Sequence, residues 1–356
     1  MATEGVNAMR TPADDGFSMP AEWGPHKRSW MAWPCREALW GDQLDAARDA
    51  YARVAMAIAE FEPVTVVARP EDVAEVSLRC GAGVASLPMA LDDSWLRDTG
   101  PSFVTNAAGA VAGVDWRFNG WGERYQPYAH DAAIARGLLE HLALDRYQAP
   151  LVLEGGSFHV DGEGTLLTTE QCLLNPNRNP SRGRGEIEDL LRAYLGVETI
   201  VWLGRGLEDD ETDGHVDNLA CFARPGTVLA LSADDPQDGN YQALQDNLAR
   251  LRAARDAKGR AFEIVEIEQP APAAGADGRR LAKSYVNFYI ANGGVVMPSF
   301  EDGRDGAAFD AVSRCFPDRT VRQVGVLDIV RGGGGIHCIT QQEPAEGAEA
   351  AREATE

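Results

Sequence analysis

The chain has 356 residues, of which 44% are hydrophobic and 25% charged, so it is long enough for a large core and is typical of a soluble globular protein. Its formal net charge of −22 argues against nucleic-acid binding, which needs a basic face, and is compatible with cationic ligands or with an acidic bias of the whole proteome. No apolar run approaches the roughly 20 residues of a membrane span, and no basic segment followed by an apolar stretch marks a secretory signal. We therefore expect a cytoplasmic protein that does not enter the membrane.

Helix-like and strand-like stretches alternate along most of the chain. Residues 1–17 and 345–356 are small and polar and are predicted to be disordered tails, with a single domain at residues 18–344 between them. Apolar residues at helical spacing predict helices at 43–61, 131–143, 186–195, 240–257 and 307–316. Short β-rich runs lie between them, for example at 63–68, 100–105, 164–169, 218–223, 226–232, 293–299 and 338–341. The helix-then-strands order recurs about five times, which predicts an α/β fold of repeated modules around a common centre.

A doubly wound sheet is the competing α/β architecture. The strands, however, come in hairpin-like pairs, because the turns DGEG at 161–164 and RPG at 224–226 each join two short strands. This antiparallel pairing favours the repeated modules. The stretch 269–279, rich in Pro, Ala and Gly, is interpreted as a surface loop and not as a linker between domains.

Six cysteines are scattered along the chain without a C-x-x-C pair, so neither a disulfide framework nor a zinc site is predicted. Most of them are expected to be small buried hydrophobes. Cys338 differs, because it follows the four glycines 332–335 and the dipeptide Ile336-His337. A glycine run permits positive φ and lets a ligand approach the main chain closely. Cys338 is therefore the candidate nucleophile.

Charged residues beside glycine open several of the predicted strands. They are Asp98 in DDSWLRDTGPSF, Glu154 in LEGGSFHV, and His215 and Asp217 in DGHVDNLACF. If the modules surround a common centre, these strand ends converge with Cys338. The predicted pocket holds one thiol, one imidazole and at least three carboxylates.

Each of these residues also has a structural interpretation. Asp98 could belong to a turn, Glu154 could end a solvated loop, and His337 would point to the opposite face of the strand that carries Cys338. The pairs His159–Asp161 and His215–Asp217 could indicate a metal hydrolase, but no third ligand lies at helical or hairpin spacing from either pair, so no metal is expected.

A thiolate in a carboxylate-rich pocket presents an electrostatic conflict, because negative neighbours disfavour a second negative charge. A cationic substrate resolves it by neutralising Asp98 and Asp217. Guanidinium fits best, since it is planar, pairs with carboxylates through parallel hydrogen bonds and has an electrophilic central carbon. Attack by Cys338 would release ammonia, His215 would protonate the leaving nitrogen and then activate water, and Glu154 would orient His215.

With these residues the chain resembles the agmatine deiminase family, which belongs to the guanidine-modifying superfamily together with the peptidyl-arginine deiminases. The resemblance spans residues 18 to about 344 and rests on specific motifs. They are MPAEWGPHKRSWMAWP at 19–34, DDSWLRDTGPSF at 92–103, LEGGSFHVDGEGTLLTTEQCLLNPNRNP at 153–180, DGHVDNLACF at 213–222 and GGGGIHCITQQEP at 332–344. The resemblance implies the pentein fold, a five-bladed α/β-propeller of ββαβ modules around a pseudo-five-fold axis.

The resemblance also implies roles. Cys338 would be the nucleophile, His215 the general acid and base, Glu154 its carboxylate partner, and Asp98 and Asp217 the guanidinium ligands. Trp95 would line the substrate site. The implied hydrolase converts agmatine and water to N-carbamoylputrescine and ammonia, a step of polyamine (putrescine) biosynthesis. It would need no metal or organic cofactor and would form a homodimer or larger homo-oligomer. Gly335 departs from the expected asparagine, which predicts a looser nucleophile loop.

Substrate choice rests on fewer residues. A deiminase of free or peptidyl arginine is the runner-up, and an arginine site would need a basic partner for the extra carboxylate. The candidate partners are Arg97, Arg117, Arg124 and Arg178. Trp95 and Trp121 are candidate walls, Trp116 is expected in the core, and Asp213 is the one member of the acidic run 209–213 retained as a substrate contact. The residue pattern is also compatible with an amidino transferase or with a non-catalytic guanidine-binding protein.

Overall fold

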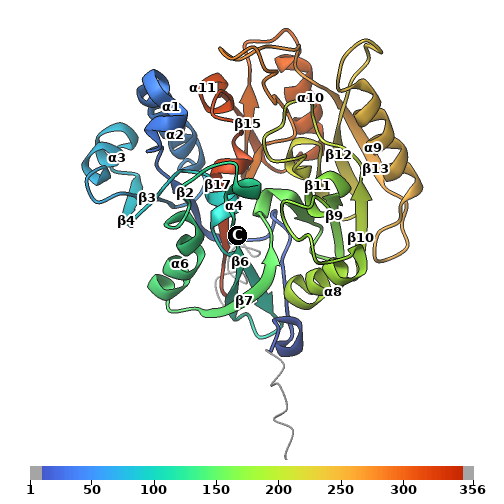
Figure 1. Cartoon of the computed structure of the whole chain (residues 1–356), viewed down its shortest axis with the longest axis horizontal. Helices are drawn as coiled ribbons and strands as arrows, with labels where there is room; N and C mark the ends of the chain where they lie inside the picture. Colours follow the sequence, from blue (N-terminus) through green and yellow to red (C-terminus); the bar gives the residue numbers. More distant parts are fainter. Residues whose placement is uncertain (1–9, 348–356) are drawn as a thin grey trace, which may run out of the picture.

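The computed structural model describes residues 10–347, and within this range 17 strands form five separate sheets (Figure 1). The first sheet has the order β1 (Phe17–Ser18), β5 (Ser102–Asn106), β6 (Val111–Arg117), β7 (Asp145–Val152). The next three are β8 (Phe158–Val160), β9 (Thr165–Thr169), β10 (Thr199–Leu203); β11 (Ala220–Arg224), β12 (Thr227–Ser232), β13 (Glu263–Glu268); and β14 (Tyr289–Ala291), β15 (Gly294–Ser299), β16 (Thr320–Gly325). The last is β17 (Thr340–Pro344), β2 (His26–Ala32), β3 (Val64–Ala68), β4 (Val84–Pro88).

Each sheet repeats one connection. An antiparallel pair is followed by a helix, and the next strand returns parallel to the second strand of the pair, as in β5–β6–α6–β7. The same pattern recurs in β8–β9–α8–β10, β11–β12–α9–β13, β14–β15–α10–β16 and β17–β2–α2–β3. The fifth unit joins the two ends of the described chain, because β17 pairs with β2. The mixed α/β fold of repeated modules is therefore confirmed, and the doubly wound sheet is excluded.

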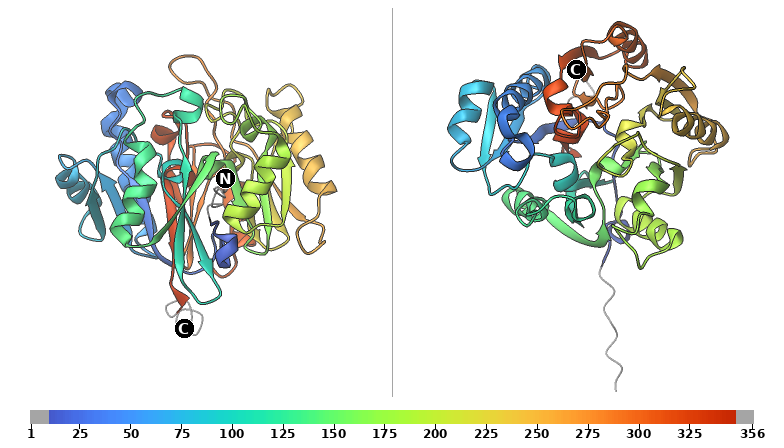
Figure 2. Two further views of the ribbon diagram at one scale, coloured as in Figure 1. Left: turned by 60° about the horizontal axis from the view of Figure 1, so that its bottom comes forward. Right: turned by 45° about the horizontal axis from the view of Figure 1, so that its top comes forward.

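The five predicted helices are all present. They are α2 (Leu44–Ile58), α6 (Ile134–Leu142), α8 (Arg184–Leu195), α9 (Tyr241–Ala253) and α10 (Asp305–Cys315). These helices lie at the periphery of the molecule with the sheets inside them (Figure 2). α6 illustrates why: its apolar positions Ile134, Ala135, Leu138 and Leu139 form one buried face, and a Cβ at Gly113 of β6 would overlap the side chain of Leu139.

One further helix of two turns and several shorter ones were not among the predicted elements. α3 (Val73–Cys80) connects β3 to β4, and β4 pairs in parallel with β3 as the last strand of the fifth sheet. The one-turn α-helices are α1 (Glu37–Trp40), α4 (Leu96–Thr99), α5 (Gly120–Glu123), α7 (Glu170–Leu173) and α11 (Leu327–Val330). The 3₁₀ turns are η1 (Ala13–Asp15), η2 (Gly41–Gln43), η3 (Asp131–Ala133), η4 (Gly155–Ser157), η5 (Val216–Asn218) and η6 (His337–Ile339).

The predicted tails need a correction at both ends. Residues 13–18 form η1 and β1, and β1 pairs with β5, so they are ordered and not part of a disordered tail. Residues 345–347 are also tied down, since the amide of Ala345 donates to Pro25 and that of Gly347 to Gly109. The remaining tail residues, 1–9 and 348–356, lie outside the described residues. No helix between residues 10 and 347 is long and apolar enough to cross a membrane.

Candidate active site

Four short turns bring the candidate residues together. The sequence predicted that Asp98, Glu154, Asp217 and Cys338 open strands. Each instead lies in or directly before a single helical turn that precedes a strand: α4 before β5, η4 before β8, η5 before β11 and η6 before β17. α4 contacts η4 and η6, and η4 contacts η5. The candidate side chains thus converge through turns and not through strand ends. A strand would direct each side chain to one face of its sheet, whereas a turn can direct it along the edge of the sheet.

A cavity of about 340 Å³, part of it open to solvent, lies over these turns. The sulfur-bearing residue Cys338 lines it together with Asp98 and the three glycines 332–334. The rest of the wall consists of the aromatic residues Trp95, Trp121 and Tyr125, the acidic residue Glu211 and the small polar residue Thr212.

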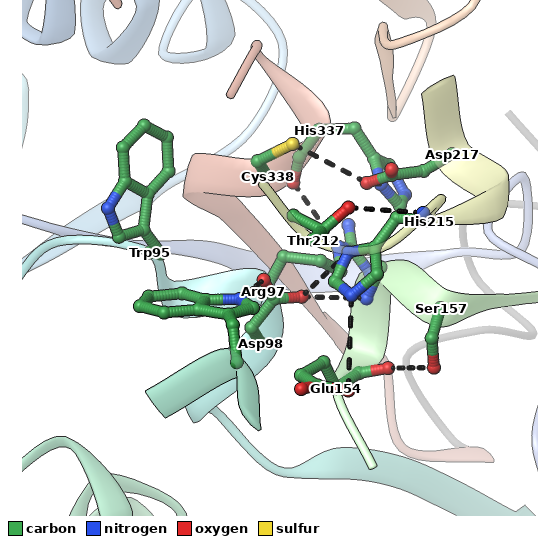
Figure 3. A network of polar contacts seen from close by, with 12 residues as sticks. Trp95, Arg97, Asp98, Glu154, Ser157, Thr212, His215, Asp217, His337 and Cys338 are labelled. Atoms are coloured by element: carbon green, nitrogen blue, oxygen red, sulfur yellow. Dashed lines mark hydrogen bonds and ion pairs between the residues drawn. The ribbon is translucent and has the colours of Figure 1, made fainter. Parts of the chain in front are cut away.

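His215 lies between two carboxylates at the centre of the cluster (Figure 3). Its Nδ1 is 3.8 Å from Oδ1 of Asp98, and its Nε2 is 3.9 Å from Oε2 of Glu154. The imidazole is completely buried, which by itself lowers the pKa of His215. The carboxylate of Asp98, followed by Cys172 and Glu154, outweighs burial and raises that pKa well above its usual value. His215 is therefore held as an imidazolium, ready to give up a proton.

Position 156, the second glycine of the sequence EGG, has no room for a side chain beside His215. A Cβ at Gly156 would lie 2.6 Å from Nδ1 of His215, 2.9 Å from Oδ2 of Asp217 and 3.0 Å from Oδ1 of Asp98. The amide of Gly156 also donates to Oδ1 of Asp98 at 2.8 Å. Glycine at this position lets an imidazole and two carboxylates approach one backbone segment.

Glu154 is held from behind by Arg178. The guanidinium Nε donates to Oε1 of Glu154 at 2.6 Å, and both side chains are completely buried. Burial acts to raise the pKa of Glu154, but Arg178 and His215 bring it below its usual value, so Glu154 stays ionised. Only Oε1 is engaged, and Oε2 faces His215 without a hydrogen bond.

Replacing Arg178 by methionine is expected to destabilise the fold by about 3–5 kcal/mol, because it leaves the buried carboxylate of Glu154 without its cation. Urea unfolding of the variant measures this. Arg136→Met is the matched control, because Arg136 and its partner Glu140 are both exposed and their charged atoms are 3.9 Å apart. This substitution is expected to change stability by less than about 1 kcal/mol. Equal midpoints for the two variants would contradict the structural role of the Arg178–Glu154 pair.

The thiol of Cys338 is buried against polar groups. Nδ2 of Asn287 donates to its sulfur at 3.2 Å, and Oδ2 of Asp217 lies 3.6 Å away. Burial first, and then the negative charges of Asp217 and Asp98, raise the pKa of the Cys338 thiol well above its usual value. This matches the expectation that the pocket by itself opposes the thiolate, so a cation is needed to activate the nucleophile.

Asn287 also bears on the predicted looseness at Gly335. A Cβ at Gly335 would collide with the Asn287 side chain, so there is no room there for a larger residue. Oδ1 of Asn287 accepts from the amide of His337 at 2.9 Å. The nucleophile turn is therefore tied to Asn287 in this chain.

Several buried polar atoms in the cluster have no hydrogen-bond partner. They are both ring nitrogens of His215, Oε2 of Glu154 and Oδ1 of Asp217. Unpartnered buried polar atoms are costly unless a ligand satisfies them. Three carboxylates and a thiol around these atoms can accept the N–H groups of a planar cation.

Two of the three tryptophans considered from the sequence line the cavity, and the third lies in the core. Trp95 and Trp121 line the cavity, and Trp116 packs in the core with its Nε1 bonded to Ser102. Trp121 donates from Nε1 to Oδ2 of Asp98 at 2.8 Å, and Trp95 stacks on Trp40 with ring centroids 5.8 Å apart. The two indoles thus hold fixed positions beside the thiol.

Asp213 does not line the cavity, although the sequence predicted that it contacts the substrate. Its Oδ2 accepts hydrogen bonds from Asn177 at 2.9 Å and from Arg178 at 2.8 Å. Asp213 therefore supports Arg178 from behind. The four arginines considered as carboxylate partners (Arg97, Arg117, Arg124 and Arg178) are likewise absent from the residues that line the cavity.

Three further residues belong to the site without having been predicted from the sequence. Glu211 lies in an acidic run that is typical of a solvated loop, but it lines the cavity, where it is hydrogen-bonded by Tyr125 and paired with Arg279. Asn287 and Glu22 contact the site from segments with no local signal of chemistry. Only the family motif around Glu22 could have indicated one of these.

Two groups of three side chains in residues 10–347 lie close enough together to hold a metal ion, Glu22–His159–His337 and Glu154–Cys172–His215. Neither is an H-x-D pair of the kind considered from the sequence. Asp161 instead accepts from the amides of Glu163 and Thr165 in its turn, and the carboxylate of Glu22 lies within 3.0 and 3.4 Å of the two imidazoles. His159 and His215 thus each belong to such a group, but Asp161 and Asp217, their partners in the H-x-D pairs, do not.

Comparison with known proteins covers nearly the whole chain. The sequence model of the Porphyromonas-type peptidyl-arginine deiminase family matches residues 18–344. Agmatine deiminase of Stutzerimonas stutzeri is 48% identical over 358 residues, which cover 94% of this chain and 97% of that protein. The solved agmatine deiminase of Enterococcus faecalis is 40% identical with a TM-score of 0.91, covering 94% of this chain and 98% of that one. A Campylobacter jejuni agmatine deiminase with a cysteine-to-serine substitution and bound substrate is 26% identical with a TM-score of 0.86, covering 93% and 97%.

Proposed function

The chain belongs to the agmatine deiminases, within the Porphyromonas-type peptidyl-arginine deiminase family, and we propose that it hydrolyses agmatine to N-carbamoylputrescine and ammonia through a covalent intermediate on Cys338. It is a hydrolase of the C–N bonds of linear amidines. The observation that carries the proposal is the pair of unpartnered buried carboxylate oxygens, Oε2 of Glu154 and Oδ1 of Asp217, beside the thiol. A guanidinium has the shape, charge and donors to satisfy them.

The first half of the reaction forms the intermediate. Guanidinium held between Asp98 and Asp217 offsets their negative charges, which favours ionisation of the Cys338 thiol. The thiolate sulfur attacks the central carbon and forms a C–S bond, giving a tetrahedral adduct. His215 gives its proton to one terminal nitrogen, the C–N bond breaks, and ammonia leaves an amidino-thioether on Cys338.

The second half releases the product. A water molecule attacks the same carbon while the now neutral His215 accepts its proton. The C–S bond then breaks, the electron pair returns to the sulfur of Cys338, and the remaining hydroxyl proton is lost to solvent, so the carbon leaves as a ureido group. Glu154 keeps His215 in place through both steps and stabilises its charged form, and Arg178 keeps Glu154 ionised.

Ammonia release from agmatine and from arginine, with EDTA present, tests the proposal directly. We expect turnover of agmatine at a kcat/KM at least about 100-fold above that of arginine, because the extra carboxylate of arginine would lie beside the carboxylate of Glu211 in a cavity lined by no described lysine or arginine. Turnover of arginine alone would keep the chemistry and overturn the substrate. The absence of turnover with both would overturn the proposal.

Agmatine is favoured over arginine by the residues that line the cavity. They include the carboxylates of Asp98 and Glu211 and, among the described residues, no lysine or arginine. The four methylenes of agmatine can lie against Trp95 and Trp121, and their burial contributes about 3 kcal/mol at roughly 0.8 kcal/mol for each CH₂. The primary ammonium of agmatine would then meet Glu211 and the hydroxyl of Tyr125 that binds it.

Glu211→Gln is expected to raise the KM for agmatine about 10- to 100-fold with a smaller change in kcat, because it removes a charged hydrogen-bond partner far from the reacting carbon. Steady-state kinetics with agmatine measures this split. Glu208→Gln is the matched control, since Glu208 lies in the same loop but does not line the cavity. An unchanged KM in Glu211→Gln would contradict the assignment of the ammonium to Glu211.

The finer architecture, assembly and location also belong to this proposal. Five sheets that share the same three-strand arrangement support a five-bladed α/β-propeller around a pseudo-five-fold axis, formed by a single domain of residues 18–344 together with the ordered residues 13–17 and 345–347. All six cysteines are free thiols, which supports a cytoplasmic location. Membership of the family is the ground for a homodimer or larger homo-oligomer, and light scattering of the purified protein would measure it.

A further inference from the structure

His337, which precedes the nucleophile, lies between two buried carboxylates. Its Nδ1 is 2.9 Å from Oδ2 of Asp217, and its Nε2 is 3.0 Å from Oε2 of Glu22 (Figure 3 shows the ring beside Asp217). The sequence predicted a structural role for His337 on the far face of a strand. The 3₁₀ turn η6 instead directs its ring to the back of the active site.

Glu22 reaches this position from the loop before β2, more than 300 residues away in sequence. Its Oε1 accepts from the amide of Ile290 at 2.9 Å, which fixes the carboxylate. Its Oε2 is also 3.4 Å from Nε2 of His159, whose Nδ1 accepts from the amide of Phe222. His159 therefore carries its proton on Nε2 and donates it to Glu22. Glu22 acts as an ionised acceptor for two imidazoles.

Because both nitrogens of His337 face carboxylate oxygens, both are donors and the ring is an imidazolium. The charged or titratable groups around the ring are Glu22, Asp217, His159 and Arg97, and Cys338 is the next residue in the chain. Burial and the positive charge of Arg97 lower the pKa of His337, but Glu22 and Asp217 outweigh them and raise it. In return, burial raises the pKa of Asp217, and the hydrogen bond and charge of His337 bring it below its usual value.

The two oxygens of Asp217 have different surroundings. Oδ2 accepts from His337 and lies 3.6 Å from the Cys338 sulfur, whereas Oδ1 has no hydrogen-bond partner. One oxygen is thus anchored from behind, and the other is free for a substrate N–H group. The positive charge of His337 also offsets the negative charge of Asp217 next to the thiol.

We propose that Glu22 and His337 are positioning residues for this reaction: Glu22 holds His337 as an imidazolium, and His337 keeps Asp217 ionised and oriented toward the guanidinium while it limits the effect of Asp217 on the thiol. The role in substrate binding rests on the proposed function, in which Asp217 binds guanidinium. The effect on the thiol depends only on the free protein.

His337→Asn tests the proposal, because asparagine is polar and close to Asp217 but is neutral and too short to reach Glu22. We expect kcat/KM for agmatine at pH 7 to fall about 10- to 100-fold, since a neutral donor replaces a charged one. We also expect the acidic limb of the pH profile to move to higher pH. Without the imidazolium the pKa of Asp217 rises, so as the pH falls Asp217 is protonated sooner and loses the guanidinium earlier than in the wild type.

The control is another buried His–Glu pair outside the site. His26 lies 3.1 Å from Glu62, and neither residue lines the cavity. His26→Asn is expected to change stability without moving the acidic limb. A uniform loss of activity in His337→Asn with the limb unmoved would reduce His337 to a structural role and overturn the proposal. Glu22→Gln keeps an acceptor for Ile290 and provides the same test, with a smaller fall in kcat/KM, if His337→Asn does not fold.

Alkylation of Cys338 by iodoacetamide, followed on its peptide by mass spectrometry without substrate, separates this inference from the proposed function. Loss of the nearby positive charge raises the pKa of the thiol, so the rate–pH curve of His337→Asn should lie at higher pH than those of the wild type and His26→Asn. If the wild type fails to hydrolyse agmatine but the curve moves, the positioning role stands without the substrate assignment. If agmatine is hydrolysed and the curves coincide, the positioning role is overturned.

Discussion

Replacing Cys338 by alanine is expected to lower kcat for agmatine by about 10⁴-fold or more, because no other group can form the covalent intermediate. Cys338 is the cysteine among the residues that line the cavity, and Asn287 and Asp217 surround its sulfur. Ammonia release under saturating agmatine measures the loss. Binding of agmatine should persist, since Asp98, Asp217 and Glu211 are unchanged.

Cys80→Ala provides the matched control for this substitution. Cys80 is also a buried free thiol, but it lies at the end of α3 outside the cavity. Its replacement should leave turnover within about twofold of wild type, since surface and core changes away from the site act mainly on stability. Ammonia release from Cys338→Ala at the wild-type rate would exclude nucleophilic catalysis by this residue.

Two features of the chain made much of the site accessible from sequence. Glycines mark where the backbone must approach other groups, as at Gly156 beside His215 and Asp217, and reactive residue types beside such glycines indicated four of the turns that meet. Helix periodicity worked for the same physical reason, because each long helix buries one apolar face on its sheet.

The parts that could not be predicted depend on partners that are distant in sequence. In β16 the alternation of exposed and buried residues is too weak to distinguish a strand from a loop by sequence alone. Its pairing with β15 is what establishes it as a strand. Arg178, Asn287 and Glu22 carry no local signal, since each acts through a residue on another module. Asp213 is an example, because its carboxylate accepts a hydrogen bond from Arg178 and it is not among the residues that line the cavity.

His215→Gln is expected to lower kcat for agmatine by about 10²- to 10⁴-fold with little change in KM, the range that general acid–base catalysis contributes. The raised pKa of His215 makes the imidazolium the form present at neutral pH, so it enters the reaction as the acid that ammonia formation needs. As the pH rises through that pKa, the wild type loses this proton and its rate should fall. Glutamine keeps polar contacts with Asp98 and Glu154 but exchanges no proton.

The same variant tests the role of His215 as the acid in the first half of the reaction. Without its proton, ammonia leaves the tetrahedral adduct slowly, so mass spectrometry of the intact protein during turnover should show no accumulation of the amidino-thioether on Cys338. His141→Gln, on the exposed end of α6, is the control and should turn over normally. Wild-type kcat in His215→Gln would mean that water or another residue moves the protons, and that the carboxylates around His215 serve only to bind the substrate.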